Sequence, residues 1–464
     1  MTLIKSISGI RGTIGGNIGE NLTPIDAVKF ASAYGVWLKQ QRNKQDYKVV
    51  VGRDARISGE MIQNLVMNTL VGLGIHVVDL GFSTTPTVEI AVPMEHADGG
   101  IILTASHNPK QWNALKLLNA KGEFLDAAEG AKILDIAESD SMDFADVDSL
   151  GKITKNQAYI DLHIDEVLNL SLVNTNAIEK ARFKVVVDGV NSTGGIAIPL
   201  LLERLGVDVV KLYCEPNGHF PHNPEPLKEH LGDLSAEVKK HRADFGIVVD
   251  PDVDRLAFMD ENGDMFGEEY TLVACADYVL SRTPGNTVSN MSSTRALRDV
   301  TEKHGGTYEA SAVGEVNVVS LMKKNKVVIG GEGNGGIIYP ESHYGRDALV
   351  GVALFLSLLA DKRISVSALR KTYPNYFMSK KKIELTPGLD VDGILKTIEH
   401  RYQNEQLATI DGVKIDFSES WVHLRKSNTE PIIRIYTEAK SQTEADALAD
   451  NFIAEIGEIA GQTS

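Results

Sequence analysis

Short β-branched runs alternate with helical patterns along most of the chain, and this alternation limits the possible folds more than any other feature. Residues 48–54 read KVVVGRD and residues 184–191 read KVVVDGVN; each run precedes a helical stretch and a second strand pattern, at 73–81 and at 205–213. A fainter passage of the same kind covers 285–314. Alternating strand and helix patterns predict βαβ units with parallel or mixed sheets. The similar spacing of the passages predicts three related α/β domains in tandem.

The end of the chain has another pattern. The segment 373–464 holds two strand patterns joined by a polar loop and flanked by helical stretches, which indicates a small α+β domain. The 464 residues suffice for several domains of ~150 residues each, with clefts between them. We expect α/β domains at 1–154, 155–259 and 260–372, followed by the C-terminal domain at 373–464.

Composition and charge argue against several kinds of partner. The chain carries 47 Lys and Arg against 63 Asp and Glu, a formal net charge of −16, whereas nucleic acids and membrane surfaces select basic patches. No apolar run approaches the ~20 residues that span a bilayer, and the N-terminus does not resemble a signal peptide, so we expect a cytoplasmic protein. Cys214 and Cys275 lie far apart and outside any metal-ligand spacing. Both are interpreted as small buried hydrophobic residues in a reducing compartment.

The first of four polar loops follows an apolar strand pattern. Residues 98–118 read DGGIILTASHNPKQWNALKLL, so Ser106 stands near a strand end, where ligands bind in open α/β sheets. A serine there can carry a phosphoryl group if a cation neutralises the charge and a base handles the proton. His107 and Lys116 are candidates for that support. Taken alone, TASHNP is better interpreted as an ordinary turn, since Ser and Asn favour turns.

The second loop concentrates carboxylates. In FGIVVDPDVDRLAFMDENG, residues 245–263, an apolar strand pattern is followed by Asp250, Asp252 and Asp254 at alternate positions and then by Arg255. Carboxylates this close repel each other unless a hard cation lies between them, and oxygen ligands suit Mg²⁺. The calcium-binding EF-hand does not fit, because Arg255 stands where that loop needs glycine. We therefore expect a magnesium site rather than a solvated acidic turn.

The third loop is rich in glycine. Residues 327–348 place Glu332 and Asn334 among five glycines, which let the backbone approach a small ligand closely. Glu332 can accept two hydroxyl hydrogen bonds, as recognition of a sugar diol requires. The loop lacks the P-loop pattern GxxxxGK[ST], and a plain structural turn is the alternative interpretation.

The fourth loop, residues 424–439, groups an arginine with small polar residues. A guanidinium beside hydroxyl and amide donors suits a phosphate dianion, although a polar hairpin tip is equally consistent with the pattern. The candidate phosphate ligands are Arg425, Ser427, Asn428, Thr429 and Arg434. Near the N-terminus, Arg11 lies between two glycines and is either a ligand for a phosphorylated Ser106 or a loop charge.

Taken together, these loops resemble the α-D-phosphohexomutase family, which includes phosphoglucomutase, phosphomannomutase and phosphoglucosamine mutase. The resemblance rests on GIRG at 9–12, TASHNP at 104–109, DPDVDR at 250–255, GEGNGG at 331–336 and RKSNTEP at 425–431, in the family's order and over essentially the whole chain. This joint match overrides the simpler interpretations of the single loops. It implies four domains around a central cleft, the first three with one topology.

The resemblance also implies a role for each loop. Ser106 would be the phosphoserine, and the three aspartates would bind Mg²⁺ together with a phosphoserine oxygen. Glu332 and Asn334 would bind the sugar hydroxyls, and the fourth loop would hold the phosphate that is not reacting. The residues that would act beside the reacting groups are Lys116, as a candidate general acid/base, Arg255, His107 and Arg11.

The implied activity is a phosphoryl transfer that interconverts hexose 6-phosphate and hexose 1-phosphate. Phosphorylated Ser106 would give its phosphoryl group to the sugar, form a hexose 1,6-bisphosphate, and recover the other phosphate. The form GEGNGG followed by IIYP and GRD is closest to archaeal-type phosphoglucosamine mutases, so glucosamine phosphate is the expected substrate, with mannose and glucose phosphates as alternatives. We expect a monomer or homodimer that binds neither nucleic acid nor membrane.

Two other classes of function are alternatives to this interpretation. A metal-dependent sugar phosphatase would need the carboxylate loop but no second phosphate cradle, and a sugar-phosphate sensor would not need Ser106 or Lys116. The sequence also departs from the family: many bacterial members end the third loop with Ser-Gly-His, where this chain has Asn334-Gly335-Gly336. His107 or His343 would then share the proton transfer. Ala114 stands where glycine is common.

Overall fold

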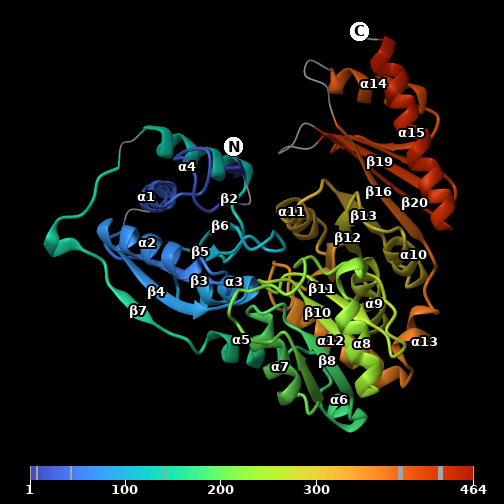
Figure 1. Ribbon diagram of the computed structural model, residues 1–464, viewed down its shortest axis with the longest axis horizontal. Helices are drawn as coiled ribbons and strands as arrows, with labels where there is room; N and C mark the ends of the chain where they lie inside the picture. Colours follow the sequence, from blue (N-terminus) through green and yellow to red (C-terminus); the bar gives the residue numbers. More distant parts are fainter. Residues whose placement is uncertain are drawn as a thin grey trace.

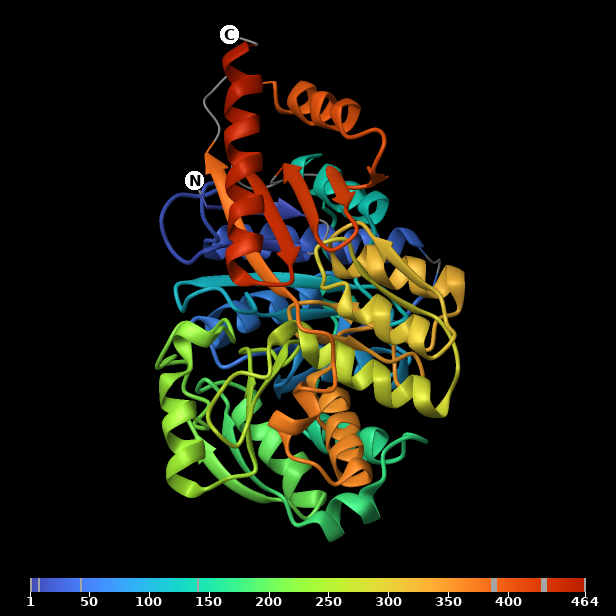
Figure 2. The same ribbon diagram turned by 90° about the vertical axis from the view of Figure 1, so that its right-hand side faces the viewer.

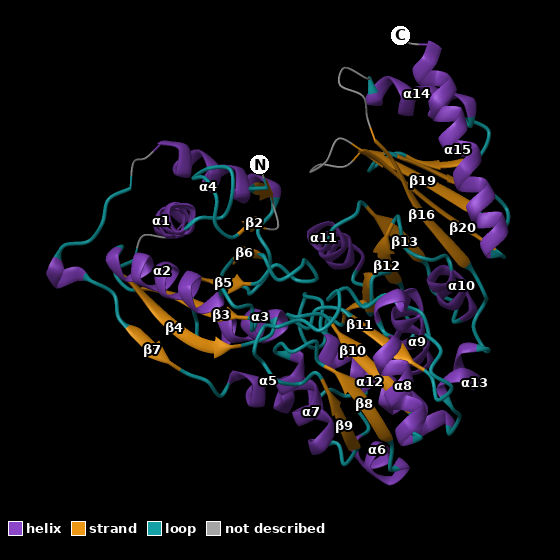
Figure 3. Cartoon of the chain, in the orientation of Figure 1, coloured by secondary structure: helices purple, strands orange, loops and turns teal. Residues whose placement is uncertain are grey.

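The protein folds into four units that follow one another along the chain, each with its own sheet (Figure 1). The computed structural model describes residues 2–6, 9–41, 44–139, 142–384, 390–426 and 432–462. The first unit has a seven-stranded sheet, the second and third have four-stranded sheets, and the C-terminal unit has five strands. Helices flank every sheet (Figure 3).

The first unit is an α/β sandwich with a mixed sheet in the order β1-β2-β6-β5-β3-β4-β7. Its strands are β1 (Ile4–Ser6), β2 (Gly9–Thr13), β3 (Tyr47–Arg53), β4 (Ile75–Phe82), β5 (Gly99–Leu103), β6 (Trp112–Leu118) and β7 (Ile153–Lys155). Its helices are α1 (Pro24–Gln41), α2 (Gly59–Gly72), α3 (Thr85–Met94) and α4 (Ala127–Ser139), with a 3-10 turn at Val147–Ser149. Side chains alternate across a strand, so Val49 and Val51 pack with α1 and α2 while Val50 packs with α3. Both faces of the central strands are thus buried.

The second and third units repeat the central part of the first. In each unit three parallel strands are followed by an antiparallel one, in the orders β6-β5-β3-β4, β11-β10-β8-β9 and β15-β14-β12-β13. The second unit consists of α5 (Tyr159–Leu168), α6 (Thr175–Ala181), β8 (Lys184–Asp188), α7 (Gly194–Arg204), β9 (Asp208–Leu212), a 3-10 turn at Lys228–His230, α8 (Gly232–His241), β10 (Phe245–Val249) and β11 (Leu256–Met259). The third consists of α9 (Glu268–Arg282), β12 (Thr287–Asn290), α10 (Ala296–Lys303), β13 (Tyr308–Ser311), α11 (Glu315–Asn325), β14 (Ile329–Glu332), β15 (Gly336–Ile338), α12 (Ala348–Lys362) and α13 (Val366–Arg370). The predicted tandem of related α/β units is confirmed.

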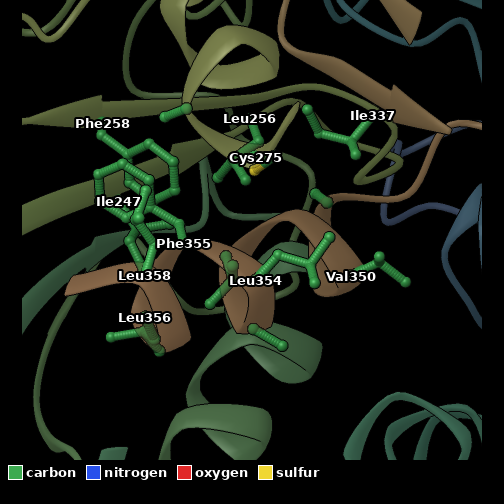
Figure 4. Close-up of a cluster of buried hydrophobic side chains, with 14 of the residues drawn as sticks. Ile247, Leu256, Phe258, Cys275, Ile337, Val350, Leu354, Phe355, Leu356 and Leu358 are labelled. Carbon is green, nitrogen blue, oxygen red and sulfur yellow. The ribbon is translucent and has the colours of Figure 1, made fainter. Parts of the chain in front are cut away.

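One hydrophobic core joins the second and third units. Helix α12 of the third unit packs on strands of the second, where the rings of Phe258 and Phe355 stack with centroids 3.7 Å apart (Figure 4). Gly351 lets this helix approach closely, because a β-carbon at this position would lie 2.7 Å from Leu256 Cδ2. The two units therefore form one block, and the loops that leave their sheets are fixed relative to each other.

The C-terminal unit is an antiparallel sheet with helices packed against it (Figure 2). It consists of β16 (Phe377–Glu384), α14 (Val391–Arg401), β17 (Gln406–Ala408), β18 (Val413–Asp416), β19 (Trp421–Lys426), β20 (Ile432–Ala439) and α15 (Gln442–Gln462). Two strands were predicted here and the described residues form five, because β16 carries three consecutive lysines and β17 and β18 are short. The buried Arg295 of the third unit anchors this sheet through the carbonyl oxygens of Phe417 and Ser420, at 3.1 and 2.9 Å.

Within the described part of the chain, no helix combines the length and apolar character that a membrane crossing needs. Cys275 is buried and Cys214 half-buried, and both are free thiols.

Candidate functional site

Three of the four predicted loops occupy the same place in the repeated fold. Each connects the last parallel strand of its unit to the antiparallel strand beside it. We call them the serine loop (104–111, between β5 and β6), the acidic loop (250–255, between β10 and β11) and the glycine-rich loop (332–336, between β14 and β15). Ligands bind at the carboxyl ends of parallel strands, so the repeat places all three loops where binding is expected.

The acidic loop buries three carboxylates. Asp250, Asp252 and Asp254 are fully buried, and one oxygen of each lies within 4.8 Å of the others. The Asp250 carboxylate closes the loop on itself, because its Oδ1 accepts the backbone N–H groups of Asp254 and Arg255 at 3.2 and 3.1 Å. The Oδ1 atoms of Asp252 and Asp254 are buried without a hydrogen-bond donor. Buried carboxylate oxygens without a donor need a cation, so this set fits a hard divalent metal ion.

The pKa values of Asp250 and Asp254 also reflect how closely charged groups are packed around the triplet. Burial, followed by the charges of Asp252 and Asp254, raises the pKa of Asp250 well above its usual value. Burial also acts to raise the pKa of Asp254, but Arg346 and Lys116 outweigh it and the pKa falls below its usual value. A divalent cation at the triplet would offset the repulsion that contributes to the raised pKa of Asp250.

Ser106 points directly at this triplet. Its Oγ donates a hydrogen bond to Asp250 Oδ2 at 2.6 Å, across 144 residues of sequence. The residue is buried and adopts a left-handed backbone conformation, with φ of 48°, which turns the side chain out of the strand end. The predicted juxtaposition of the serine and acidic loops is thus present in the structure.

The buried Arg56 holds the serine loop in place. Its guanidinium pairs with Asp54 at 3.0 Å and donates to the carbonyl oxygens of Ser106, Asn108 (2.7 Å), Pro109 (2.8 Å) and Trp112 (3.0 Å). No motif in the sequence indicated Arg56. Its only signal was its place in the charged turn GRDAR at the end of β3, whereas the carbonyls that it binds lie 50 to 56 residues away.

Lys116 lies on β6 and reaches the acidic loop. Its Nζ donates to Asp252 Oδ2 at 2.6 Å and to Asp254 Oδ2 at 3.2 Å. Burial alone would lower the pKa of Lys116, but the Asp252 and Asp254 carboxylates outweigh burial and raise it above its usual value. Thr85, which the sequence did not indicate, also donates to Asp252 Oδ2, at 2.5 Å. Lys116 is therefore a cation in contact with two carboxylates of the acidic loop.

The remaining residues predicted beside Ser106 lie around the same loop. Arg11 donates to the Asn108 side chain at 2.8 Å, and His107 Nδ1 is 3.3 Å from Ser106 Oγ. Burial and then the charges of Arg255 and Arg11 lower the pKa of His107 well below its usual value, so the ring is neutral. Arg255 pairs with Glu225 at 3.2 Å.

The glycine-rich loop is bonded to the first residue of β11, directly after the acidic loop. The backbone N–H of Leu256 donates to the carbonyl oxygen of Gly335 at 3.1 Å. A β-carbon at Gly335, where φ is 86°, would lie 2.2 Å from Leu256 O, so only glycine permits this approach. Glu332 Oε1 accepts from the Asn290 side chain at 2.8 Å, and Asn334 Oδ1 accepts from the backbone of Gly336 at 3.2 Å. The two predicted sugar ligands are therefore held beside the acidic loop.

The fourth predicted loop is described only in part. Arg425 on β19 lies opposite Arg434 on β20 and pairs with Asp411 at 3.3 Å. Ser427, Asn428 and Thr429 lie outside the described residues, so the phosphate cradle stays a prediction.

His343, one of the two histidines proposed to share the proton transfer, lies in a buried ion-pair cluster. Its Nδ1 lies 3.3 Å from Glu89 Oε2 and its Nε2 3.2 Å from Asp347 Oδ2. Burial alone would lower the pKa of His343, but Asp347 and Glu89 raise it to about 10. Asp347 also pairs with His163 at 2.8 Å. Both ring nitrogens of His343 are thus engaged by carboxylates.

Comparisons with known proteins agree over the whole length. The four domain models of phosphoglucomutase/phosphomannomutase match residues 3–143, 161–263, 267–376 and 379–455, as alpha/beta/alpha domains I, II and III and the C-terminal domain. A phosphoglucomutase/phosphomannomutase from Thermococcus kodakarensis is 36% identical, over 94% of this chain and 95% of the relative. A phosphoglucosamine/phosphogalactosamine mutase from Sulfurisphaera tokodaii is 30% identical, over 95% of this chain and 96% of the relative.

Solved structures share the architecture. A phosphoglucomutase/phosphomannomutase family protein from Burkholderia thailandensis superposes with a TM-score of 0.84 at 25% identity, covering 98% of each chain. An N-acetylphosphoglucosamine mutase from Aspergillus fumigatus, at 15% identity and a TM-score of 0.59, covers 99% of this chain and 96% of its own and shows the same fold.

Proposed function

The chain belongs to the phosphoglucomutase/phosphomannomutase family, and from that premise we propose that it interconverts glucosamine 6-phosphate and glucosamine 1-phosphate through a phosphorylated Ser106. Members of the family are phosphohexomutases, so the enzyme class predicted from the sequence is confirmed. The choice of glucosamine rests on the GEGNGG loop and on relatives that carry the name phosphoglucosamine mutase. Because other relatives carry the name phosphoglucomutase/phosphomannomutase, a broad specificity for glucose and mannose phosphates is the alternative.

The observation that carries the proposal is the hydrogen bond from Ser106 to the buried acidic triplet. The Ser106 hydroxyl lies 2.6 Å from Asp250 Oδ2, so a phosphoryl group on this serine would stand beside the residues that would hold the cation. We propose that Asp250, Asp252 and Asp254 hold Mg²⁺, since the buried oxygens without donors form an all-oxygen ligand set. When bound there, the ion would neutralise charge on the phosphoryl group.

The side chains around Ser106 supply the rest of the proposed chemistry. Lys116 keeps its proton beside the acidic triplet and can give it to Ser106 Oγ as the phosphoryl group leaves for a sugar hydroxyl. The proton of that hydroxyl would pass to the neutral ring of His107, whose Nδ1 lies 3.3 Å from Ser106 Oγ. Arg11 and Arg255 neutralise negative charge, and the neutral His107 orients the serine hydroxyl.

The sugar is held from its other side. Glu332 and Asn334 would accept hydrogen bonds from its hydroxyls, and the unreacting phosphate would bind Arg425, Ser427, Asn428, Thr429 and Arg434. The hexose 1,6-bisphosphate then turns over and presents its second phosphate to Ser106. Keeping water out during this step separates a mutase from a phosphatase.

Two assays on one preparation test the proposal. Values of kcat/KM for glucosamine, glucose and mannose phosphates should rank glucosamine first, and Ser106→Ala should abolish turnover of all three. Free phosphate should remain a minor product. Equal turnover of the three sugars would instead support the broad specificity, whereas phosphate release as the main reaction, or full activity of Ser106→Ala, would refute the phosphoserine mechanism.

A further inference from the structure

Arg346, the arginine of GRD at 345–347, lies where the acidic and glycine-rich loops meet, and the sequence assigned it no role. Arg346 precedes α12 and is only 8% exposed. Its guanidinium donates to Asp254 Oδ2 at 2.8 Å and lies 3.3 Å from Glu332 Oε2. One side chain thus contacts a proposed metal ligand and a proposed sugar ligand at once. The two carboxylates come from different units of the fold.

The stem of Arg346 fills the space beside Gly336. A β-carbon at Gly336 would lie 2.3 Å from Arg346 Cδ and 3.0 Å from Cγ, so no larger residue fits while the arginine keeps its place. Gly336 is the position at which many bacterial members of the family carry the histidine of Ser-Gly-His. Arg346 and a side chain at 336 therefore exclude each other, and this chain has the arginine.

Arg346 is held from behind by groups outside both loops. Glu315 at the start of α11 accepts from the Arg346 backbone N–H at 3.0 Å and from its Nε at 2.9 Å. On one side, Gly345 lies so close to α3 that a β-carbon there would be 1.8 Å from Glu89 Oε2. On the other side, Asp347 caps α12 by accepting the N–H of Leu349 at 2.8 Å. The guanidinium is pre-oriented by these contacts before any sugar binds.

We propose that Arg346 is a positioning residue that ties the sugar-binding Glu332 to the acidic loop and takes the structural place of the missing histidine. Arg346 holds Oε2 of Glu332, while the Asn290 side chain and the backbone N–H of Gly314 donate to Oε1 at 2.8 and 3.3 Å. The carboxylate is therefore fixed with a lone pair of Oε2 left for a sugar hydroxyl. This role rests on the proposed function, because it assigns Glu332 to the sugar. His343 cannot take the same place, since Glu89 and Asp347 engage both of its ring nitrogens.

Substitution at 346 should affect sugar binding more than turnover. Loss of a hydrogen bond to a charged group corresponds to about a 10- to 100-fold change in an equilibrium. Arg346→Met should therefore raise KM for glucosamine 6-phosphate about 10- to 100-fold with a smaller change in kcat, and Arg346→Lys should recover part of the loss. Arg370→Met is the matched control: this arginine of the same unit stacks on Tyr270 at 3.4 Å, away from the loops.

Gly336 supplies an independent test. Gly336→Ala places a β-carbon against the Arg346 stem and should raise KM for glucosamine 6-phosphate. This variant tests the role of Arg346 in a case where Arg346→Met does not fold. Gly232→Ala, at a position with no atom within 4 Å of the new β-carbon, should have no effect. Gly336→His alone should strongly lower kcat/KM. In the double variant Arg346→Ala with Gly336→His, the loss of kcat/KM should be smaller than the product of the losses in the two single variants.

Direct binding separates this inference from the proposed function. In a Ser106→Ala background, calorimetric titration with glucosamine 6-phosphate should show about 10- to 100-fold weaker binding when Arg346→Met is added. Unchanged binding and KM in Arg346→Met and Gly336→Ala, or a double variant no better than the product of its singles, would overturn the role of Arg346 alone. Wild-type protein without Ser106-dependent mutase activity would overturn the proposed function, while the titration would still report on Arg346.

Discussion

Replacing Arg56 by methionine should detach the serine loop from the sheet. Methionine keeps the apolar stem but removes the guanidinium that binds Asp54 and four backbone carbonyls. Breaking a buried ion pair by removing one partner costs about 3–5 kcal/mol, because the other charge stays buried. Asp54 keeps two donors, Thr104 Oγ1 at 2.6 Å and the N–H of residue 56 at 2.9 Å, so we expect the lower end of this range.

A loss of about 3 kcal/mol corresponds to roughly a 100-fold increase in local opening. Hydrogen exchange followed by mass spectrometry should therefore show roughly 100-fold faster exchange of protected amides in residues 104–112, with strands of the third unit unchanged. The rate at which glucose 1,6-bisphosphate phosphorylates Ser106, measured from the intact mass, should fall by at least about 100-fold, because misplacement by ~1 Å can cost that much.

A double variant separates the two contributions of Arg56. Asp54→Asn with Arg56→Met removes the unpaired charge, so exchange should slow again while phosphorylation stays slow, because the carbonyls still lack their donor. The control is Arg53→Met, whose side chain stacks on Phe82 at 4.3 Å and does not touch the serine loop. Wild-type exchange and wild-type phosphorylation in Arg56→Met would refute the assigned role.

Three further predictions concern the metal, the pH and the shared core. Asp252→Asn should weaken Mg²⁺ binding at least about tenfold in a calorimetric titration, because it removes one of the three carboxylate charges. The control Asp260→Asn, in the same hairpin, should leave Mg²⁺ binding unchanged. Equal affinities of the two variants would contradict the assigned site. Burial raises the pKa of Glu269 from 4.5 to about 8. The contribution of protonated Glu269 to the free energy of unfolding is therefore complete below pH 4.5 and is lost as the pH rises through about 8. The melting temperature of wild type should therefore fall relative to that of Glu269→Gln across this window, and parallel curves would refute the shift. Phe355→Ala should cost about 3–5 kcal/mol and speed hydrogen exchange in both β10 and α12; acceleration in α12 alone would argue against a core common to two units.

Much of the fold and part of the site follow from local sequence. The runs around 48–54 and 184–191 are apolar enough to identify their strands, and the motifs at Ser106 and Asp250 lie directly after such strands. The third repeat was faint because β12 and β14 read TVSN and IGGE, which carry little hydrophobic signal. Strand pattern depends on buried apolar side chains, so short or glycine-rich strands in a sheet centre escape it.

The site residues that no sequence motif assigned a role bind partners far away along the chain. Arg56 binds the carbonyl oxygen of Asn108, 52 residues away, Thr85 binds Asp252 at a separation of 167 residues, and Arg346 binds Asp254 at a separation of 92. Arg346 stands in the quoted motif GRD, which assigned it no role, and the other two stand in no quoted motif. A lone arginine or threonine is compatible with a solvated surface until the chain folds. The residue pairs that would orient the proposed chemistry are therefore determined by long-range packing, whereas the residues proposed to react stand in single loops with recognisable motifs.

The repeat explains why the chemistry can be divided among loops of one kind. In each of the three α/β units, the loop connects a parallel strand to the antiparallel strand beside it and lies outside the strand pairing. The residues of the loop can therefore change without disrupting the sheet. The serine and acidic loops meet at 2.6 Å, and the glycine-rich loop bonds at 3.1 Å to Leu256, directly after the acidic loop. A change in the first two loops would disturb the proposed phosphoryl transfer. The glycine-rich loop and Arg346 are proposed to act on the sugar ring and supply neither the phosphoserine nor a metal ligand. Discrimination among hexose phosphates should therefore be determined within residues 332–336 and by the arginine that fixes Glu332.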